Sequence, residues 1–156
     1  MELKFLDDRL EEFKPATELS AGYDLRACIH ENEFVELFPG ATIKVKTGIA
    51  LHMGSLGGGF NDGSDTLYAA VIMPRSGLGC RGIKPRNVPG LIDADYQGEI
   101  IICLHNESED YVKVAPMERI AQLVFIPVLH PILTIVDKFS NETERGENGF
   151  GSTGSH

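Results

Sequence analysis

The sequence contains no tryptophan, few cysteines and no long apolar segment. Its three cysteines, Cys28, Cys80 and Cys103, lie far apart and form no Cys-x-x-Cys pair, so we expect reduced thiols and no structural zinc site. No apolar run approaches the length of a membrane span, and the opening residues MELKFLDDRLEEFK lack a secretory signal pattern. These absences predict a soluble, cytoplasmic protein that does not enter a membrane.

Positive charge is also scarce. The chain has 14 lysines and arginines against 23 acidic residues, which gives a formal net charge of −9 and a pI near 4.9. Such a surface repels a nucleic-acid backbone and disfavours a general DNA or RNA partner. A small anionic ligand would need local arginines and a divalent cation to offset this field.

Glycine and proline, in contrast, are frequent, with 17 and 8 residues. Residues 42–52 alternate apolar and polar positions, as a half-buried strand does. The β-branched runs at 67–74, 98–106 and 119–128 predict more buried strands, and shorter ones are expected at 4–6, 33–37, 111–114 and 132–138. Only residues 7–13 have helical spacing. The pattern predicts an all-β jelly roll, barrel or sandwich.

The length of 156 residues suits one domain. We expect a β domain over residues 1–139, interrupted by a polar glycine-rich loop at 54–65, and a flexible arm over 140–156. The arm is too rich in glycine and hydroxyl groups to fold alone. It carries Arg145 and Phe150, which indicates either a frayed tail or a segment that orders on a flat, anionic ligand.

The stretch PRSGLGCRG follows a predicted strand and has the Gly-x-Gly-x-x-Gly spacing. A dinucleotide-binding fold needs a helix after this motif, and Pro85 and Pro89 prevent a continuous one. Exposed backbone N–H groups beside Arg75 and Ser76 suit a phosphate. A plain tight turn with a surface arginine is the alternative.

The stretch NVPGLIDADYQGEI concentrates polar residues between two predicted strands. It predicts a β-hairpin whose tip carries Asp93, Asp95 and Tyr96. A carboxylate there could activate water as a general base, whereas the simpler interpretation is an aspartate-rich turn. Charged residues also occur in SAGYDLRA and at the start of ERIAQLVF, where solvated strand faces would explain them equally well.

Taken together and in order, AGYDLRA, PRSGLG, GLIDADYQGEI, ERIAQLVF and RGENGFGSTG closely resemble the five motifs of the homotrimeric dUTPase family (deoxyuridine 5′-triphosphate nucleotidohydrolases). The resemblance covers the chain from about Leu19 to Gly154. It implies a jelly-roll fold, a homotrimer with swapped C-terminal arms, and Mg²⁺-dependent hydrolysis of dUTP to dUMP and pyrophosphate. In the cell that reaction limits uracil in DNA and supplies dUMP.

The resemblance also implies residue roles at the reacting phosphate. Asp93 matches the general base that activates the water attacking the α-phosphate, and Asp24 matches an aspartate that contacts the metal through water. The remaining phosphate contacts match Arg75, Ser76, Gly77 and Gln122.

For the nucleoside, Tyr96 resembles the tyrosine that packs on deoxyribose and leaves no room for a 2′-hydroxyl. Asn87 and the main chain of the hairpin, Gly90 included, match the groups that read uracil. In the arm, Arg145 resembles an arginine finger and Phe150 the ring that stacks on uracil, while the γ-phosphate would be wrapped by Gly151, Ser152 and Thr153.

Two rival functions remain open. The related dCTP deaminases share this fold and bind a deoxynucleoside triphosphate, but a deaminase needs a group that moves protons at the exocyclic amine, and here Asp93 stands in the dUTPase position. The second rival is a nucleotide-binding regulatory protein that uses the loop at 54–65 to bind a partner protein.

Overall fold

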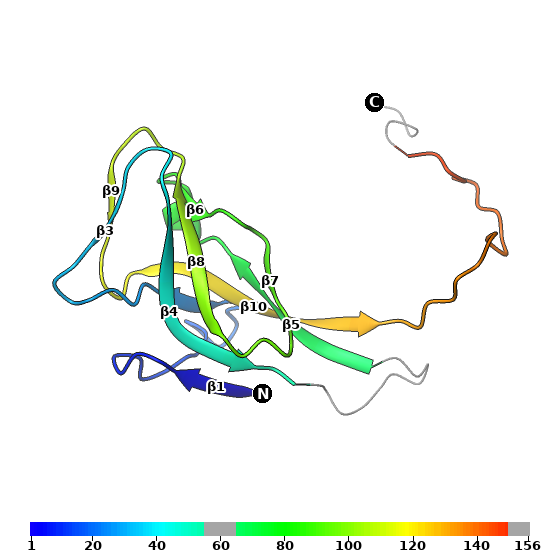
Figure 1. Ribbon diagram of the computed structural model, residues 1–156, viewed down its shortest axis with the longest axis horizontal. Helices are drawn as coiled ribbons and strands as arrows, with labels where there is room; N and C mark the ends of the chain where they lie inside the picture. The colour runs from blue at the N-terminus through cyan, green and yellow to red at the C-terminus, as the bar shows by residue number, and fades with distance from the viewer. Residues whose placement is uncertain (55–64, 150–156) are drawn as a thin grey trace.

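The computed structural model describes residues 1–54 and 65–149 of the chain (Figure 1). In this part the chain forms ten strands and one short helix. In chain order they are β1 (Glu2–Phe5), β2 (Tyr23–Arg26), β3 (Val35–Leu37), β4 (Thr42–His52), β5 (Asp65–Met73), α1 (Ser76–Gly79), β6 (Ile83–Pro85), β7 (Gly90–Ile92), β8 (Glu99–Asn106), β9 (Val112–Val114) and β10 (Arg119–His130). The loop expected at 54–65 falls almost wholly outside the described residues.

The strands form two four-stranded sheets and a small two-stranded one. The first sheet has the order β1-β4-β8-β6 and the second the order β2-β10-β5-β7, while β3 pairs with β9. Every pairing is antiparallel, and non-consecutive strands are neighbours throughout. The all-β, jelly-roll-like prediction is confirmed.

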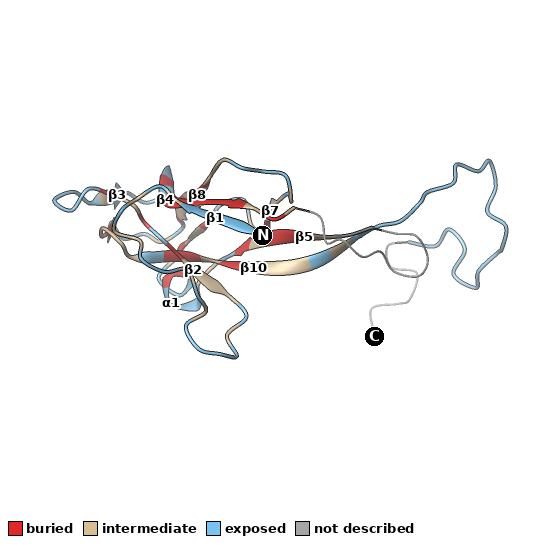
Figure 2. Cartoon of the chain, turned by 90° about the horizontal axis from the view of Figure 1, so that it is seen from below, coloured by how far each residue is buried: buried red, intermediate tan, exposed pale blue. Residues whose placement is uncertain are grey.

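The core lies between the two large sheets, where the buried residues concentrate on the inner faces (Figure 2). Leu25 of β2, Ile102 and Leu104 of β8 and Leu123 of β10 are all at most 1% exposed. β-branched and leucine side chains at alternate positions supply this layer, as the run of apolar residues predicts.

The alternation expected in β4 ends partway along the strand. Val45 and Thr47 are buried while Lys44 and Lys46 are exposed, but from Thr47 to Leu51 every residue is buried. The reason is a second layer, because residues 6–10 cover the outer face of β4 beside Gly48. Gly48 has φ +66°, and a Cβ there would lie 2.8 Å from the Cys28 sulfur and 2.9 Å from the Asp7 Cβ.

The helical spacing at residues 7–13 was misleading, because the structure forms no helix there. The segment is fixed instead by ionic contacts. Arg9 donates from Nε to Asp7 Oδ1 (2.9 Å) and from Nη1 to the Ile29 carbonyl oxygen (2.7 Å). The hydrogen bond from Arg9 holds the pKa of Asp7 well below its usual range. Burial, together with the neighbouring Asp7, raises the pKa of Cys28 to about 12, so this thiol stays protonated.

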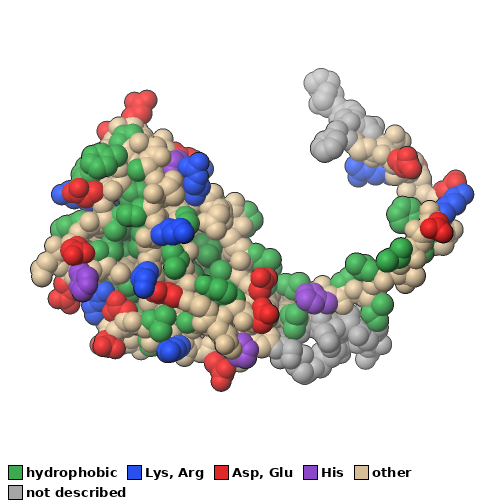
Figure 3. All heavy atoms as spheres, viewed as in Figure 1, with side chains coloured by type: hydrophobic (Ala, Val, Ile, Leu, Met, Phe, Trp, Pro, Cys, Tyr) green, Lys and Arg blue, Asp and Glu red, His purple; other side chains and the backbone are tan. Residues whose placement is uncertain are grey.

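The strand predicted at 132–138 is also absent. After β10 the chain runs away from the body, and the described residues from 131 to 149 are all exposed (Figures 1 and 3). Ile135 is 99% exposed, and Ile132, Leu133 and Phe139 are each more than 80% exposed. A β-branched run forms a strand only when it has a neighbour to pair with, and no described residue pairs with this one.

Candidate active site

Three segments that are distant in sequence meet at one pocket of about 640 Å³. β2 supplies Asp24, the end of β5 leads into Arg75, Ser76 and Gly77, and β10 supplies Gln122. The sheet order explains the meeting, because β10 lies between β2 and β5 and places Gln122 opposite both Asp24 and Met73. We call this the phosphate pocket.

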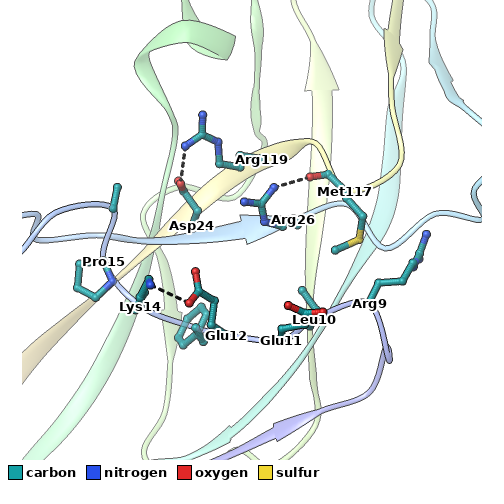
Figure 4. Close-up of a pocket in the computed structure, with 12 residues that line it drawn as sticks. Arg9, Leu10, Glu11, Glu12, Lys14, Pro15, Asp24, Arg26, Met117 and Arg119 are labelled. Atoms are coloured by element: carbon teal, nitrogen blue, oxygen red, sulfur yellow. Dashed lines mark hydrogen bonds and ion pairs between the residues drawn. The ribbon is translucent and has the colours of Figure 1, made fainter.

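Asp24 is the charged centre of the phosphate pocket. Its Oδ1 lies 2.9 Å from Arg75 Nε. Its Oδ2 accepts a hydrogen bond from Arg119 Nη1 at 3.1 Å, which Figure 4 shows. The Asp24 side chain is 21% exposed and that of Arg75 29% exposed, so this network is partly shielded from water. Two guanidinium groups therefore hold one carboxylate.

Gln122 is fixed by its side-chain amide, which donates to the Pro74 carbonyl oxygen (2.9 Å). Gly22 makes room for it, since a Cβ at Gly22 would lie 2.5 Å from Gln122 Oε1. The amide therefore ties β10 to the turn that carries Arg75.

The glycine-rich turn after β5 is one turn of helix, α1, rather than a plain turn. Gly79 N–H donates to the Arg75 carbonyl oxygen (2.9 Å) and Cys80 N–H to that of Ser76 (2.9 Å). The chain then continues as strand β6, so no dinucleotide-binding helix follows. Ser76 and Gly77 stay exposed at the pocket rim.

Asp93 lies in a different pocket, of about 570 Å³, which we call the turn pocket. The predicted hairpin is wrong in its pairing: β7 pairs with β5 and β8 with β4 and β6, so residues 93–98 connect two sheets. Tyr96 N–H donates to the Asp93 carbonyl oxygen (3.2 Å), which closes a tight turn. The end of β4 holds this turn, because Met53 and Gly54 both donate N–H groups to the Ala94 carbonyl oxygen (3.1 and 3.3 Å).

Tyr96 folds back over its own turn, where its hydroxyl donates to the Glu99 carbonyl oxygen (3.0 Å). Gly98 permits this, since a Cβ at Gly98 would lie 2.5 Å from the Tyr96 hydroxyl. Asn87 is exposed before β7, and its carbonyl oxygen lies 3.0 Å from the position of a Cβ at the buried Gly90. The predicted nucleoside residues thus lie on or just before β7 and the turn.

The two pockets have no lining residue in common. On one chain, therefore, the predicted base Asp93 lines a different pocket from the predicted phosphate ligands. Arg145 is far along the exposed arm, where its Nε donates to the Asn148 carbonyl oxygen (3.0 Å). The predicted residues Phe150, Gly151, Ser152 and Thr153 lie outside the described residues.

Within residues 1–54 and 65–149, no group of three or more His, Cys, Asp or Glu side chains is arranged to hold a metal ion. Asp24 is the acidic side chain that lines the phosphate pocket. A single carboxylate suits only a cation that takes its other ligands from water and substrate phosphates, as Mg²⁺ commonly does. In the same ranges no helix is long and apolar enough to cross a membrane.

Residues 8–154 match the dUTPase family profile, over nearly the whole chain. The chain belongs to the dUTPase family. It is 45% identical over 161 residues to the deoxyuridine 5′-triphosphate nucleotidohydrolase of Hydrogenovibrio crunogenus, covering 100% of this chain and 97% of the relative. The enzyme of the same name from Neisseria meningitidis serogroup C is 47% identical with the same coverage.

Solved dUTPases have the same fold. The dUTPase of Staphylococcus bacteriophage 80alpha, solved with dUpNHpp, aligns with a TM-score of 0.77 at 26% identity, over 98% of this chain and 97% of the phage chain. With the family and the named relatives, this identifies the chain as a hydrolase, a dUTP diphosphatase.

Three residues at the dUTPase pockets were assigned no role from the sequence, although Arg119 was noted as a charged residue at the mouth of an apolar strand. Arg119 contacts Asp24, and His52 and His130 line the turn pocket together with Asp93. Strand alternation would separate Arg119 from Gln122, but the register of β10 against β2 shifts between Arg119 and Ala121. At this irregularity the consecutive residues Ile120 and Ala121 are both buried.

Proposed function

We propose that this dUTPase hydrolyses dUTP to dUMP and pyrophosphate through attack of water on the α-phosphate, with Mg²⁺ as cofactor. The observation that carries the proposal is the convergence of Asp24, Arg75 and Gln122 in one pocket from three distant segments. The phage dUTPase solved with dUpNHpp supports a uracil deoxynucleotide as the ligand.

In the phosphate pocket, Arg75 would offer a charged, forked donor to phosphate oxygens, with Ser76 and Gly77 at the rim and Gln122 beside them. Mg²⁺, held by Asp24 through water, would neutralise phosphate charge as the reaction proceeds. The phosphate pocket can therefore bind both Mg²⁺ and phosphate, because the negatively charged Asp24 lies among cationic and neutral hydrogen-bond donors.

Asp93 is the proposed general base. It is exposed in the turn pocket, where its carboxylate can reach a water molecule on a substrate that enters from solvent. Tyr96 would pack on deoxyribose and exclude a 2′-hydroxyl. Asn87 and the main chain around Gly90 would read the uracil edge.

The complete site requires more than one chain. Because the two pockets share no residue, we propose a homotrimer in which the turn pocket of one subunit faces the phosphate pocket of a second. Exposed apolar side chains between β10 and the arm support assembly, since exposing Ile135 and Phe139 to water brings a solitary chain no stability.

The arm of a third subunit would close each site. In this proposal residues 1–139 form the β domain and residues 140–156 the closing arm, with Arg145 on the phosphates and Phe150 on uracil. Gly151, Ser152 and Thr153 would surround the γ-phosphate. Closure by a segment that orders on the nucleotide excludes water and still lets the product leave.

The proposed physiological role is that of a soluble cytoplasmic enzyme, which keeps uracil out of DNA by removing dUTP and provides dUMP for nucleotide synthesis. Neither nucleic acid nor a membrane takes part, and the acidic surface agrees with this.

The test is incubation of the protein with dUTP, dCTP, dTTP and UTP in turn, with Mg²⁺, assaying pyrophosphate, orthophosphate and ammonia separately. We expect pyrophosphate from dUTP and almost nothing from the other nucleotides, and loss of the activity when a chelator removes Mg²⁺. Ammonia from dCTP would establish the deaminase instead, and orthophosphate as the first product would rule out attack at the α-phosphate.

A further inference from the structure

The Asp24 carboxylate stands between two pockets. On one side is the phosphate pocket, and on the other a pocket of about 560 Å³ that includes Arg26 and Arg119 (Figure 4). One guanidinium group from each pocket contacts the Asp24 carboxylate. Arg75 holds Oδ1 from the phosphate side (2.9 Å), and Arg119 holds Oδ2 (3.1 Å).

We propose that Arg119 is a positioning residue for dUTP hydrolysis. When Arg75 leaves Asp24 to bind the triphosphate, Arg119 keeps the Asp24 carboxylate directed at the phosphate pocket. In this way it couples Mg²⁺ binding to nucleotide binding. The inference rests on the proposed function, in which Arg75 binds phosphate and Asp24 meets the cation.

Arg75 cannot fully bind the Asp24 carboxylate and a substrate triphosphate at the same time. Its Nε is engaged by Asp24, and its Nη1 makes only a long contact to the Arg119 carbonyl oxygen (3.4 Å). A bound triphosphate offers more negative charge and a geometry that fits the guanidinium fork. When Arg75 turns to the phosphates, Asp24 Oδ1 loses its partner beside the nucleotide, where the cation is needed.

The position of Arg119 allows it to keep its contact with Asp24 after Arg75 turns to the phosphates. Arg119 contacts the other carboxylate oxygen and lines a second pocket, one that Arg75, Ser76 and Gly77 do not line. Its neighbour across the strands, Arg26, donates instead to the Met117 carbonyl oxygen (2.9 Å) and so does not compete for Asp24. The carboxylate therefore keeps one fixed oxygen while the other becomes free.

This exchange predicts positive coupling between the two ligands. Without nucleotide, Asp24 already has two cationic partners, so Mg²⁺ alone binds weakly. With nucleotide bound, one partner has left and Mg²⁺ takes its place. By linkage, Mg²⁺ then tightens nucleotide binding by the same factor.

The test measures binding rather than turnover. Calorimetry gives the affinity of the full-length protein for the dUTP analogue dUpNHpp with and without Mg²⁺, and the ratio of the two affinities is the magnesium effect. In Arg119→Gln we expect this ratio to fall about 10–100-fold, as when the partner of a metal ligand is removed. Arg119→Lys keeps the charge and should lie between Gln and wild type. It also replaces the Gln variant if thermal melting shows that the latter is unfolded.

Arg26→Gln is the matched control, because it removes the same charge from the neighbouring strand without touching Asp24. Its magnesium effect should equal that of the wild type. In an Asp24→Asn background, Arg119→Gln should change nothing further.

Suppose that folded Arg119→Gln, or the Lys variant used in its place, keeps the wild-type magnesium effect while Asp24→Asn loses it. This result would overturn the role of Arg119 and leave the proposed function intact. If Asp24→Asn also keeps the full effect, the contact between Asp24 and the cation fails as well.

Discussion

At the scale of single residues, Tyr96 shows how a short turn can hold an aromatic ring rigidly on its surface. Its hydroxyl donates to the Glu99 carbonyl oxygen, and Gly98 leaves room for the ring. The ring is therefore fixed before any substrate arrives, and a fixed wall can reject one extra hydroxyl group on a sugar.

The prediction is that Tyr96→Ala narrows the preference for dUTP over UTP by at least about tenfold in kcat/KM, because the space for a 2′-hydroxyl opens. Steady-state kinetics with both nucleotides measures it. Tyr96→Phe keeps the ring and is the control, with a preference close to that of the wild type. A preference that is unchanged in Tyr96→Ala would remove this residue from sugar recognition.

The individual site residues were the easiest features to find in the sequence. That they converge in one pocket was the hardest feature to predict. Asp24 and Gln122 are polar residues within strands and Arg75 follows one, and the motifs single out all three. The sequence does not give the sheet order that places β10 between β2 and β5, because strand pairing depends on contacts far apart in the chain. Arg119 stood out in the sequence as a charged residue at the start of β10, but its contact with Asp24 depends on a register shift that could not be predicted.

At the scale of elements, the segment between β1 and β2 is held in place by an ion pair within it and by hydrogen bonds to the rest of the domain. Asp7 accepts from Arg9, which in turn donates to the Ile29 carbonyl oxygen, and Leu6 N–H donates to the Gly48 carbonyl oxygen (2.8 Å). These contacts cover the outer face of β4, so they should contribute to stability in a pH-dependent way.

Because hydrogen bonding from Arg9 lowers the pKa of Asp7, the stability from this pair is fully present above the ordinary carboxyl pKa of about 3.9 and is lost as pH falls towards the lower folded-state pKa. We predict that Asp7→Asn lowers Tm by roughly 3–6 °C at pH 7, from the loss of about 1.5 kcal/mol of charge-assisted hydrogen bonding. The deficit should shrink below about pH 4.

Thermal melts from pH 7 to pH 3 measure this difference. Asp8→Asn, an exposed neighbour, is the control and should melt with the wild type throughout. A deficit of Asp7→Asn that stays constant to the lowest pH would show that the stabilisation comes from packing and not from the ionised carboxylate.

The segment between β10 and the arm is the one for which the strand-like sequence pattern and the structure of a single chain differ. Residues 132–138 have the composition of a strand and pair with nothing that the structure describes. The composition was informative all the same, since it indicates a segment that needs an apolar partner. In the proposed trimer, that partner is another copy of the chain.

We predict that Ile135→Asp weakens assembly by about tenfold or more, because a buried aliphatic side chain contributes roughly 1.5–3 kcal/mol. Ile135 is 99% exposed in one chain, so the substitution should not disturb the fold of the subunit. Analytical ultracentrifugation over a range of concentrations measures the association. Asn141→Asp adds the same charge at an exposed polar position and should assemble normally; equal assembly of both variants would mean that Ile135 does not lie in a subunit contact.

At the scale of the whole molecule, the central claim is that one chain carries two halves of a site and that neighbouring chains join them. Asp93 belongs to the turn pocket and Arg75 to the phosphate pocket. A site built within one chain would need both groups from the same copy. A site built between chains needs each group from a different copy.

The most direct measurement is complementation between Asp93→Asn and Arg75→Gln. Each pure protein should be nearly inactive on dUTP, the first without its base and the second without its phosphate ligand. Unfolding and refolding the two together in equal amounts gives mixed trimers, whose composition mass spectrometry confirms. If each site takes Asp93 from one subunit and Arg75 from another, about a quarter of the sites in random mixtures are intact, and activity should return to roughly that fraction of the wild type. Confirmed mixed trimers that remain as inactive as their parents would contradict a site shared between subunits.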